Sequence, residues 1–219
     1  MKDFASQEPT GWTAREKEFF EKLDSPIKIQ AYLNRIPYDP DYGSRSPRYV
    51  IREGKAHCFE GAVFAAAALR FLGHKPLLLD LEASANDDDH VLAVFKQNGC
   101  WGAIAKSNYT VLRFREPVYR TPRELTMSYF DVFFNPVCEK TMRRYSHPLD
   151  LSQFDRLNWM TTDGDLDYIG DRLNAIKHYV VLTPAMIRRL TLADPDLVKA
   201  GLLGANKAGL FKPKKSKQQ

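Results

Sequence analysis

The 219-residue chain lacks the features that mark several large classes of protein. It has no run of eighteen apolar residues, so no segment has the length and hydrophobicity of a transmembrane helix. Residues 1–7 lack the apolar stretch of a signal peptide. We therefore expect a protein of the cytoplasm, with no membrane partner.

Cysteine is scarce, with three residues, Cys58, Cys100 and Cys138, at unpatterned spacings. An odd number without pattern argues against a disulfide framework and fits a reducing compartment. A zinc site built from His57, Cys58, His90 and the acidic run 87–89 is a competing use of these side chains. The chain has neither a CxxC pair nor an HExxH helix to supply ligand spacing, so we expect no metal and no cofactor.

Acidic residues are missing from the C-terminal end, where residues 205–219 hold five lysines and no acid. Removing them takes the formal net charge from +5 to 5 − 5 = 0, so the basic excess belongs to a tail. Such a tail is typical of a solvated, disordered end, and we expect no nucleic-acid partner. The remainder, residues 1–204, is predicted to be a single domain with a core over about 20–135 and a helical extension over about 136–204.

Helix signals dominate the first third of the chain. Thr13 to Glu16 is a capping box that predicts a helix through Leu23, and Ser25-Pro26 predicts a second helix. Residues 37–48 are rich in Pro, Asp, Gly and Ser and are typical of a surface loop. A long apolar helix is then predicted from Cys58 to Leu72, ended by Gly73.

A β-hairpin follows this helix. Apolar runs at 76–81 and 91–95 predict strands, and Asn98-Gly99 predicts a two-residue turn that returns the chain over 100–107. If Gln97 pairs with Cys100, each cross-strand pair sums to 197 and His90 lies opposite Ser107. The face carrying Leu92, Val94, Ala103 and Ala105 then has room for the Cys58 helix.

The rest of the chain is predicted to hold one more strand, over 111–115, and otherwise helices. Thr121-Pro122 opens a helix through Phe134, and further starts lie near Asp165, Thr183 and Asp194. The fold class is therefore α+β, with a central helix packed on an antiparallel sheet. Five arginines are expected on solvated faces: Arg143, Arg144, Arg156, Arg188 and Arg189.

Cys58 and His90 are the candidate catalytic pair. A thiol at a helix N-terminus faces unpaired N–H groups and the positive end of the helix dipole, both of which favour thiolate. We therefore expect a thiolate pKa well below about 8.5, dependent on His90. The alternative is structural, because a free cysteine in an alanine-rich helix is commonly part of the core.

A third group should orient the imidazole. No acid occurs between His90 and Glu116, so the candidates are Ser107 by ideal register, or Asn108 if a bulge shifts the strand. Asp88 is a weaker alternative. His57 is expected to be an exposed loop residue, and the aromatic residues Trp101 and Tyr109 are expected to pack the strand.

The arrangement resembles the transglutaminase-like superfamily and its papain-like core. The resemblance covers roughly residues 20–115 and is carried by the segment 54–62, by His90 on the following strand and by Trp101 after it. Residues 25–38 are similar to the helical lead-in of bacterial members. Where the family has an aspartate, this chain offers Lys106, Ser107 or Asn108.

The resemblance implies thiol acyl chemistry, since its members include transglutaminases, peptide N-glycanases, bacterial cysteine peptidases and inactive descendants. We expect an amide hydrolase or acyl transferase that acts on a peptide or protein amide, with Cys58 as nucleophile, His90 as base, and water or an amine as acceptor. The Cys58 backbone N–H would contribute to an oxyanion hole. The alternative is a catalytically silent module that binds a peptide or protein in the same cleft.

Overall fold

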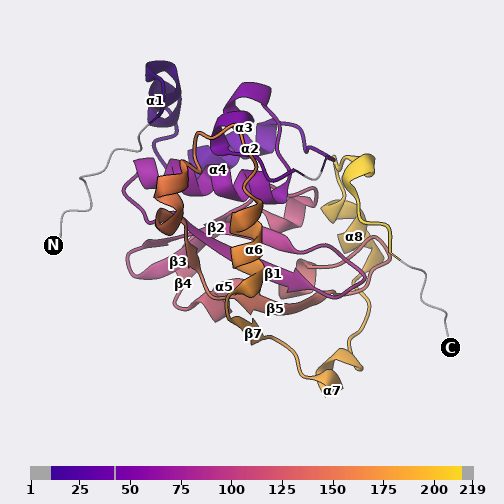
Figure 1. Cartoon of the computed structure of the whole chain (residues 1–219). Helices are drawn as coiled ribbons and strands as arrows, with labels where there is room; N and C mark the ends of the chain where they lie inside the picture. Colours follow the sequence, from indigo (N-terminus) through magenta and orange to yellow (C-terminus); the bar gives the residue numbers. More distant parts are fainter. Residues whose placement is uncertain (1–10, 42, 214–219) are drawn as a thin grey trace.

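An antiparallel sheet of seven strands organises the described part of the chain, residues 11–41 and 43–213 of the computed structural model (Figure 1). The strand order is β4-β3-β2-β1-β5-β7, and β6 pairs with β1. The α+β fold class is therefore confirmed. The strands are β1 Leu77–Ala83, β2 His90–Gln97, β3 Cys100–Ile104, β4 Arg115–Tyr119, β5 Met142–Ser146, β6 Leu149–Asp150 and β7 His178–Val180.

The N-terminal helices gather on one face of this sheet (Figure 1). The longest, α4, packs against β2, where its alanine-rich surface meets Val91, Ala93 and Phe95. The predicted helix starts at Thr13, Ser25 and Cys58 are confirmed, whereas α3 was not predicted. The helices are α1 Ala14–Glu21, α2 Pro26–Arg35, α3 Pro47–Glu53 and α4 Cys58–Phe71.

The predicted packing face of the Cys58 helix is wrong. Leu92, Val94, Ala103 and Ala105 point to the opposite face, where they pack with residues such as Tyr129. Because β2 is buried on both faces, its apolar run does not tell which face the helix covers. The sheet is therefore covered on two sides rather than one.

The predicted hairpin is confirmed in register and turn. Gln97 pairs with Cys100 and Ala93 with Ile104, and both turn residues, Asn98 and Gly99, have positive φ. The return strand stops earlier than expected, at Ile104. The next residue leaves the ladder because the Gln30 side chain both donates to its carbonyl and accepts from its N–H.

The C-terminal third is not the all-helical extension that the sequence indicated. It supplies β5, β6 and β7, and β5 pairs directly with the central strand β1. Arg144 therefore lies in a strand, paired across the ladder with Glu82. These strands are short and rich in polar residues, so their hydrophobic alternation is weak. The predicted helix starts here are confirmed as α6 Asp167–Ala175, α7 Pro184–Ile187 and α8 Pro195–Gly201.

Two middle elements also differ from expectation. A 3₁₀ turn over Thr110–Leu112 replaces the start of the strand predicted at 111–115, and β4 begins at Arg115. The helix from Thr121 is α5 Pro122–Met127, which ends well before Phe134. Thr121 accepts the Glu124 N–H as its predicted cap.

The first part of the basic tail is ordered, contrary to the prediction. Within residues 205–213, Lys207–Gly209 form a 3₁₀ turn. Asn206, just before this turn, exchanges hydrogen bonds with Asn108. Three of the tail lysines, Lys214, Lys215 and Lys217, lie outside the described residues. Residues 1–7, which were expected not to form a signal peptide, also lie outside them. Within the described ranges, no helix has the length and hydrophobicity to cross a membrane.

A close approach between α4 and the end of β3 yields a stability prediction. A Cβ at Gly61 would lie 2.2 Å from the Lys106 Cβ, whereas a Cβ at Gly170 in α6 would meet nothing within 4 Å. We expect Gly61→Ala to lower the free energy of unfolding by about 1–3 kcal/mol through overpacking. Gly170→Ala should raise it by up to about 1 kcal/mol through helix propensity.

Urea denaturation of the two variants and the wild type measures this difference. Equal stability of the two alanine variants would show that the contact at Gly61 does not restrict the helix.

Candidate functional site

Cys58 is the first residue of α4, and the residue before it caps the helix. The His57 Nδ1 accepts the Phe59 N–H at 3.2 Å, and the Glu60 carboxylate accepts the His57 N–H at 3.2 Å. His57 is thus buried, not the exposed loop residue that was expected, and burial lowers its pKa. This reciprocal cap sets where α4 begins, and so where the thiol lies.

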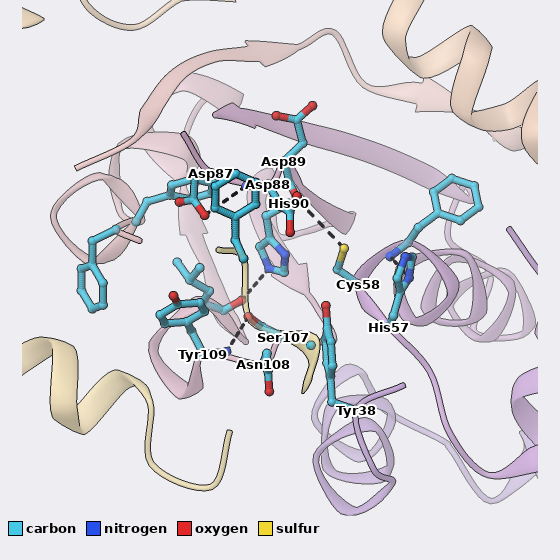
Figure 2. Close-up of a pocket in the computed structure, with 16 residues that line it drawn as sticks. Tyr38, His57, Cys58, Asp87, Asp88, Asp89, His90, Ser107, Asn108 and Tyr109 are labelled. Atoms are coloured by element: carbon cyan, nitrogen blue, oxygen red, sulfur yellow. Dashed lines mark hydrogen bonds between the residues drawn. The ribbon is translucent and has the colours of Figure 1, made fainter. Parts of the chain in front are cut away.

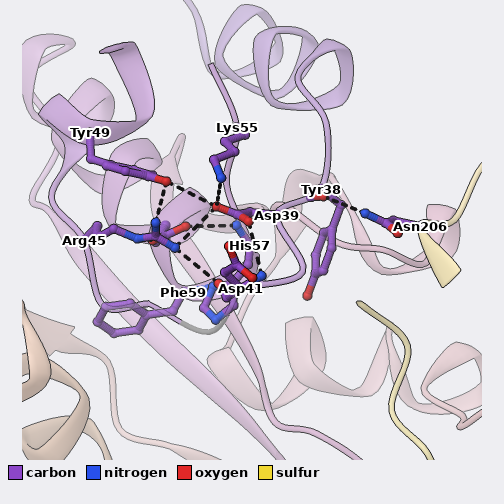
Figure 3. Close-up of polar contacts among 10 residues, drawn as sticks. Tyr38, Asp39, Asp41, Arg45, Tyr49, Lys55, His57, Phe59 and Asn206 are labelled. Atoms are coloured by element: carbon purple, nitrogen blue, oxygen red, sulfur yellow. Dashed lines mark hydrogen bonds and ion pairs between the residues drawn. The ribbon is translucent and has the colours of Figure 1, made fainter. Parts of the chain in front are cut away.

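Buried charges hold this first turn in place (Figure 3). The Arg45 Nε donates to Glu60 at 2.6 Å, and another guanidinium nitrogen lies 3.3 Å from Asp39. Lys55 pairs with Asp39 at 3.2 Å. Both carboxylates are fully buried, so each needs its cation, and the loop before α3 is tied to the start of α4.

His90 is the first residue of β2 and is buried. Its Nε2 lies 2.9 Å from the carbonyl oxygen of Leu112, in the 3₁₀ turn before β4. A carbonyl can only accept, so this contact places the proton on Nε2 and leaves Nδ1 as the acceptor. The group that orients the imidazole is therefore a backbone carbonyl, which cannot be predicted from the pattern of side chains.

The predicted orienting residues have other partners. The Ser107 hydroxyl accepts the Tyr109 N–H at 3.0 Å. The Asn108 amide donates to the Asn206 carbonyl at 2.9 Å and accepts the Asn206 N–H at 2.7 Å. Among the hydrogen bonds of the described residues, neither side chain reaches His90, which corrects the prediction. Asn108 instead holds the C-terminal segment against the site.

Cys58, His90, Ser107 and Asn108 nevertheless line one cavity of about 230 Å³, termed here the Cys58 cavity (Figure 2). The thiol and the imidazole lie on facing walls, contributed by α4 and by β2. The C-terminal segment forms part of the rim through Gly209 and Phe211. The other lining residues are Tyr38, His57, Phe59, Asp87, Asp88, Asp89, Tyr109, Leu112, Phe133 and Phe134.

The protonation state of Cys58 differs from the expected thiolate. Desolvation raises the pKa of the Cys58 thiol to about 12, although the N–H groups of Val91 and Phe59 favour the thiolate. Asp88 and Asp80 add like-charge repulsion. Desolvation also lowers the pKa of His90 to about 4, against the favourable Leu112 carbonyl. At neutral pH, both groups are therefore uncharged.

Two further groups in the Cys58 cavity carry chemistry that the sequence reasoning missed. The Tyr109 hydroxyl is buried and has no hydrogen-bond partner among the described residues. Such a group costs about 1–3 kcal/mol unless something satisfies it, so it is suited to contact a bound ligand. Burial raises the pKa of both Asp87 and Asp89 to about 6, which makes one rim acidic but readily protonated.

No group of three or more His, Cys, Asp or Glu within residues 11–41 and 43–213 is arranged to hold a metal ion. The chain matches no known protein-family model and no curated protein.

The lowered pKa of His90 predicts how acid affects stability. The unfolded imidazole takes up a proton near pH 6.5, whereas the folded one does so only near pH 4. The stabilisation is present above pH 6.5 and is lost as the pH falls towards 4. Between pH 7 and pH 5, the stability of the wild type relative to His90→Gln should fall by about 2 kcal/mol.

Urea denaturation of the wild type and His90→Gln at both pH values measures this difference. Asp87 and Asp89 titrate in both proteins, so their contributions cancel to first order. His178→Gln is the control of opposite sign, because its hydrogen bond to Asp80 raises the pKa of His178. The stabilisation from His178 is present below pH 6.5 and is lost as the pH rises. A His90→Gln profile parallel to the wild type would contradict the buried neutral imidazole.

Proposed function

We propose that the chain is a cysteine-dependent amide hydrolase or acyl transferase, with Cys58 as nucleophile and His90 as general base. The observation that carries this proposal is the 2.9 Å contact between the His90 Nε2 and the Leu112 carbonyl oxygen. This contact leaves Nδ1 as a proton acceptor in the cavity that Cys58 also lines. This arrangement supports Cys58 as nucleophile, His90 as base and the Leu112 carbonyl as orienting group.

The first step starts from the neutral pair. As the Cys58 sulfur attacks the amide carbonyl carbon, its proton passes to His90 Nδ1 and the carbonyl oxygen becomes an oxyanion. The Cys58 backbone N–H, in the first turn of α4, has no partner among the described residues and is available to donate to that oxyanion.

The second step resolves the tetrahedral intermediate. The imidazolium gives its proton to the amine nitrogen, the C–N bond breaks, and an acyl thioester remains on Cys58. Water or a second amine then attacks the thioester while His90 accepts its proton, and the thiol is regenerated. Throughout, the Leu112 carbonyl accepts from Nε2 and stabilises the imidazolium less than a carboxylate would.

The substrate class follows from the walls of the cavity. Phe133, Phe134 and Leu112 offer an apolar surface, while Asp87 to Asp89 make the other rim acidic. We propose a peptide or protein amide with an apolar side chain near the scissile bond. In this proposal, the unpartnered Tyr109 hydroxyl would donate to a backbone carbonyl of that substrate.

A distant relation to the transglutaminase-like superfamily is part of the same proposal. It is supported by the order of elements, with a cysteine opening α4 and a histidine opening β2. In place of the family's aspartate, the Leu112 carbonyl would serve as the third group.

A second candidate is a silent module that binds a peptide in the Cys58 cavity. The raised pKa of the thiol favours it, because a neutral thiol is a poor nucleophile until it loses its proton. Both candidates use the same cavity, but only the first requires His90 to accept the thiol proton.

A substrate-like electrophile separates the two candidates. A peptidyl vinyl sulfone that occupies the Cys58 cavity should label Cys58 faster than Cys100 and Cys138, because His90 accepts the proton during addition. His90→Ala should slow this labelling by about 100-fold, the usual contribution of a general base. His74→Ala removes another partly buried histidine, outside the cavity, and should leave the rate unchanged.

Site-resolved mass spectrometry of the labelled protein measures the rates. If Cys58 is labelled at the same rate in both histidine variants, His90 is not a general base, and the binding module is the better proposal. A binding isotherm for the unreactive peptide on Cys58→Ala, measured in parallel, tests the cavity apart from its chemistry.

A further inference from the structure

A second cavity, of about 710 Å³, lies at the end of the sheet away from His90. It is lined where β1 begins and β2 ends, and by residues of β3, α5, β5 and β7. Lys96 and Trp101, a direct cross-strand pair, place it on the face opposite α4. It is independent of the Cys58 cavity, with which it shares no lining residue.

Aromatic rings form much of its wall. Tyr145 and Tyr179 pair across β5 and β7 and stack, with ring centroids 5.2 Å apart and planes inclined by 28°. Trp101 adds a partly exposed indole. A partly exposed ring such as Trp101 offers a flat surface on which another planar ring can lie, whereas Tyr145 is buried against Tyr179.

Positive charge surrounds these rings. Three cationic side chains, Lys75, Lys96 and Arg123, line the second cavity against one carboxylate, Asp150. Lys75 approaches Asp150 only at 3.9 Å, with both side chains substantially exposed. Lys96 lies over Trp101 at 4.6 Å, and neither it nor Arg123 is paired with a carboxylate among the described residues. The cavity thus has cations to offer an anion.

We infer that the second cavity binds a nucleoside phosphate. The planar base would stack on Trp101 or on the tyrosine pair, and the phosphate would be held by Lys96 and Arg123. A guanidinium presents paired N–H donors that match phosphate oxygens, and an ammonium adds a point charge. The volume lies within the range of small-molecule sites, about 300–1,000 Å³.

Trp101 provides an internal reporter for this proposal. The other tryptophans, Trp12 and Trp159, are buried in the core on the α4 side. A ring stacked on Trp101 should quench its fluorescence, and the change should vanish in Trp101→Phe. Titration of the full chain with AMP should give a saturable change with Kd at or below about 1 mM.

Adenosine and inorganic phosphate test the two halves of the ligand, and each should bind at least about tenfold more weakly than AMP. Arg123→Gln should raise the AMP Kd by about tenfold, a loss of one charge-assisted contact. Arg120→Gln removes the same charge three positions earlier, outside the lining, and should bind AMP as the wild type does. Calorimetry repeats the titration without depending on the indole, and Cys58→Ala should not change its result.

Several results would overturn the proposal. These are the absence of saturable AMP binding, adenosine binding as tightly as AMP, or equal AMP affinity in the two arginine variants. Lys96→Gln, measured by calorimetry, gives a second test should Arg123→Gln fail to fold. Binding of a single-stranded oligonucleotide without binding of AMP would point to a nucleic-acid surface and count against the nucleotide site.

Discussion

The buried carboxylate of Glu60 is the constraint on which the candidate site depends. A carboxylate without solvent must be met by donors, and Glu60 obtains them from Arg45 and from the His57 N–H (Figure 3). Burial raises the pKa of Glu60, while the His57 N–H and the Arg45 guanidinium favour the charged carboxylate and oppose this shift. The position of the first turn of α4, and with it Cys58, is thus set by charge satisfaction as well as by helix propensity.

The same network reaches outward through Arg45. Its guanidinium also contacts Asp39 and lies over the ring of Tyr49 in α3, 4.1 Å from the centroid. A loop rich in Gly, Pro and Ser would otherwise leave this side of the Cys58 cavity undefined. Arg45 therefore links Asp39 in the loop before α3, Tyr49 in α3 and Glu60 in the first turn of α4.

The opposite wall depends on the sheet. His90 is placed by the β1–β2–β3 ladder, while its ring is oriented by Leu112, whose turn packs against α8. The two walls meet because Gly61 lets α4 approach Lys106. Lys106 in turn donates to the Leu33 and Ile36 carbonyls at the end of α2, which fixes the chain just beyond β3. Helix packing and strand register are thus both needed to form the site.

Sequence patterns predicted those features that depend on neighbouring residues. The Thr13 capping box, the Asn98-Gly99 turn and the start of α4 at Cys58 follow from local rules, and they suffice to bring Cys58 and His90 into consideration. The short strands β5 to β7 were not predicted, because their stability comes from pairing with β1 or, for β7, with β5, rather than from their own alternation. The Leu112 carbonyl that orients His90 was not predicted for a related reason, since a backbone carbonyl has no signature in the sequence.

The neutral resting pair limits how such a site could react. An ion pair formed before a substrate binds would place two charges in a desolvated cavity. The Leu112 carbonyl stabilises the imidazolium, but desolvation and the charges of Asp88 and Asp80 disfavour the thiolate. Charge separation then becomes favourable only when a substrate carbonyl supplies a new acceptor for the developing negative charge and the α4 N-terminus supplies donors to it. In the proposed reaction, proton transfer and carbonyl attack would therefore proceed together.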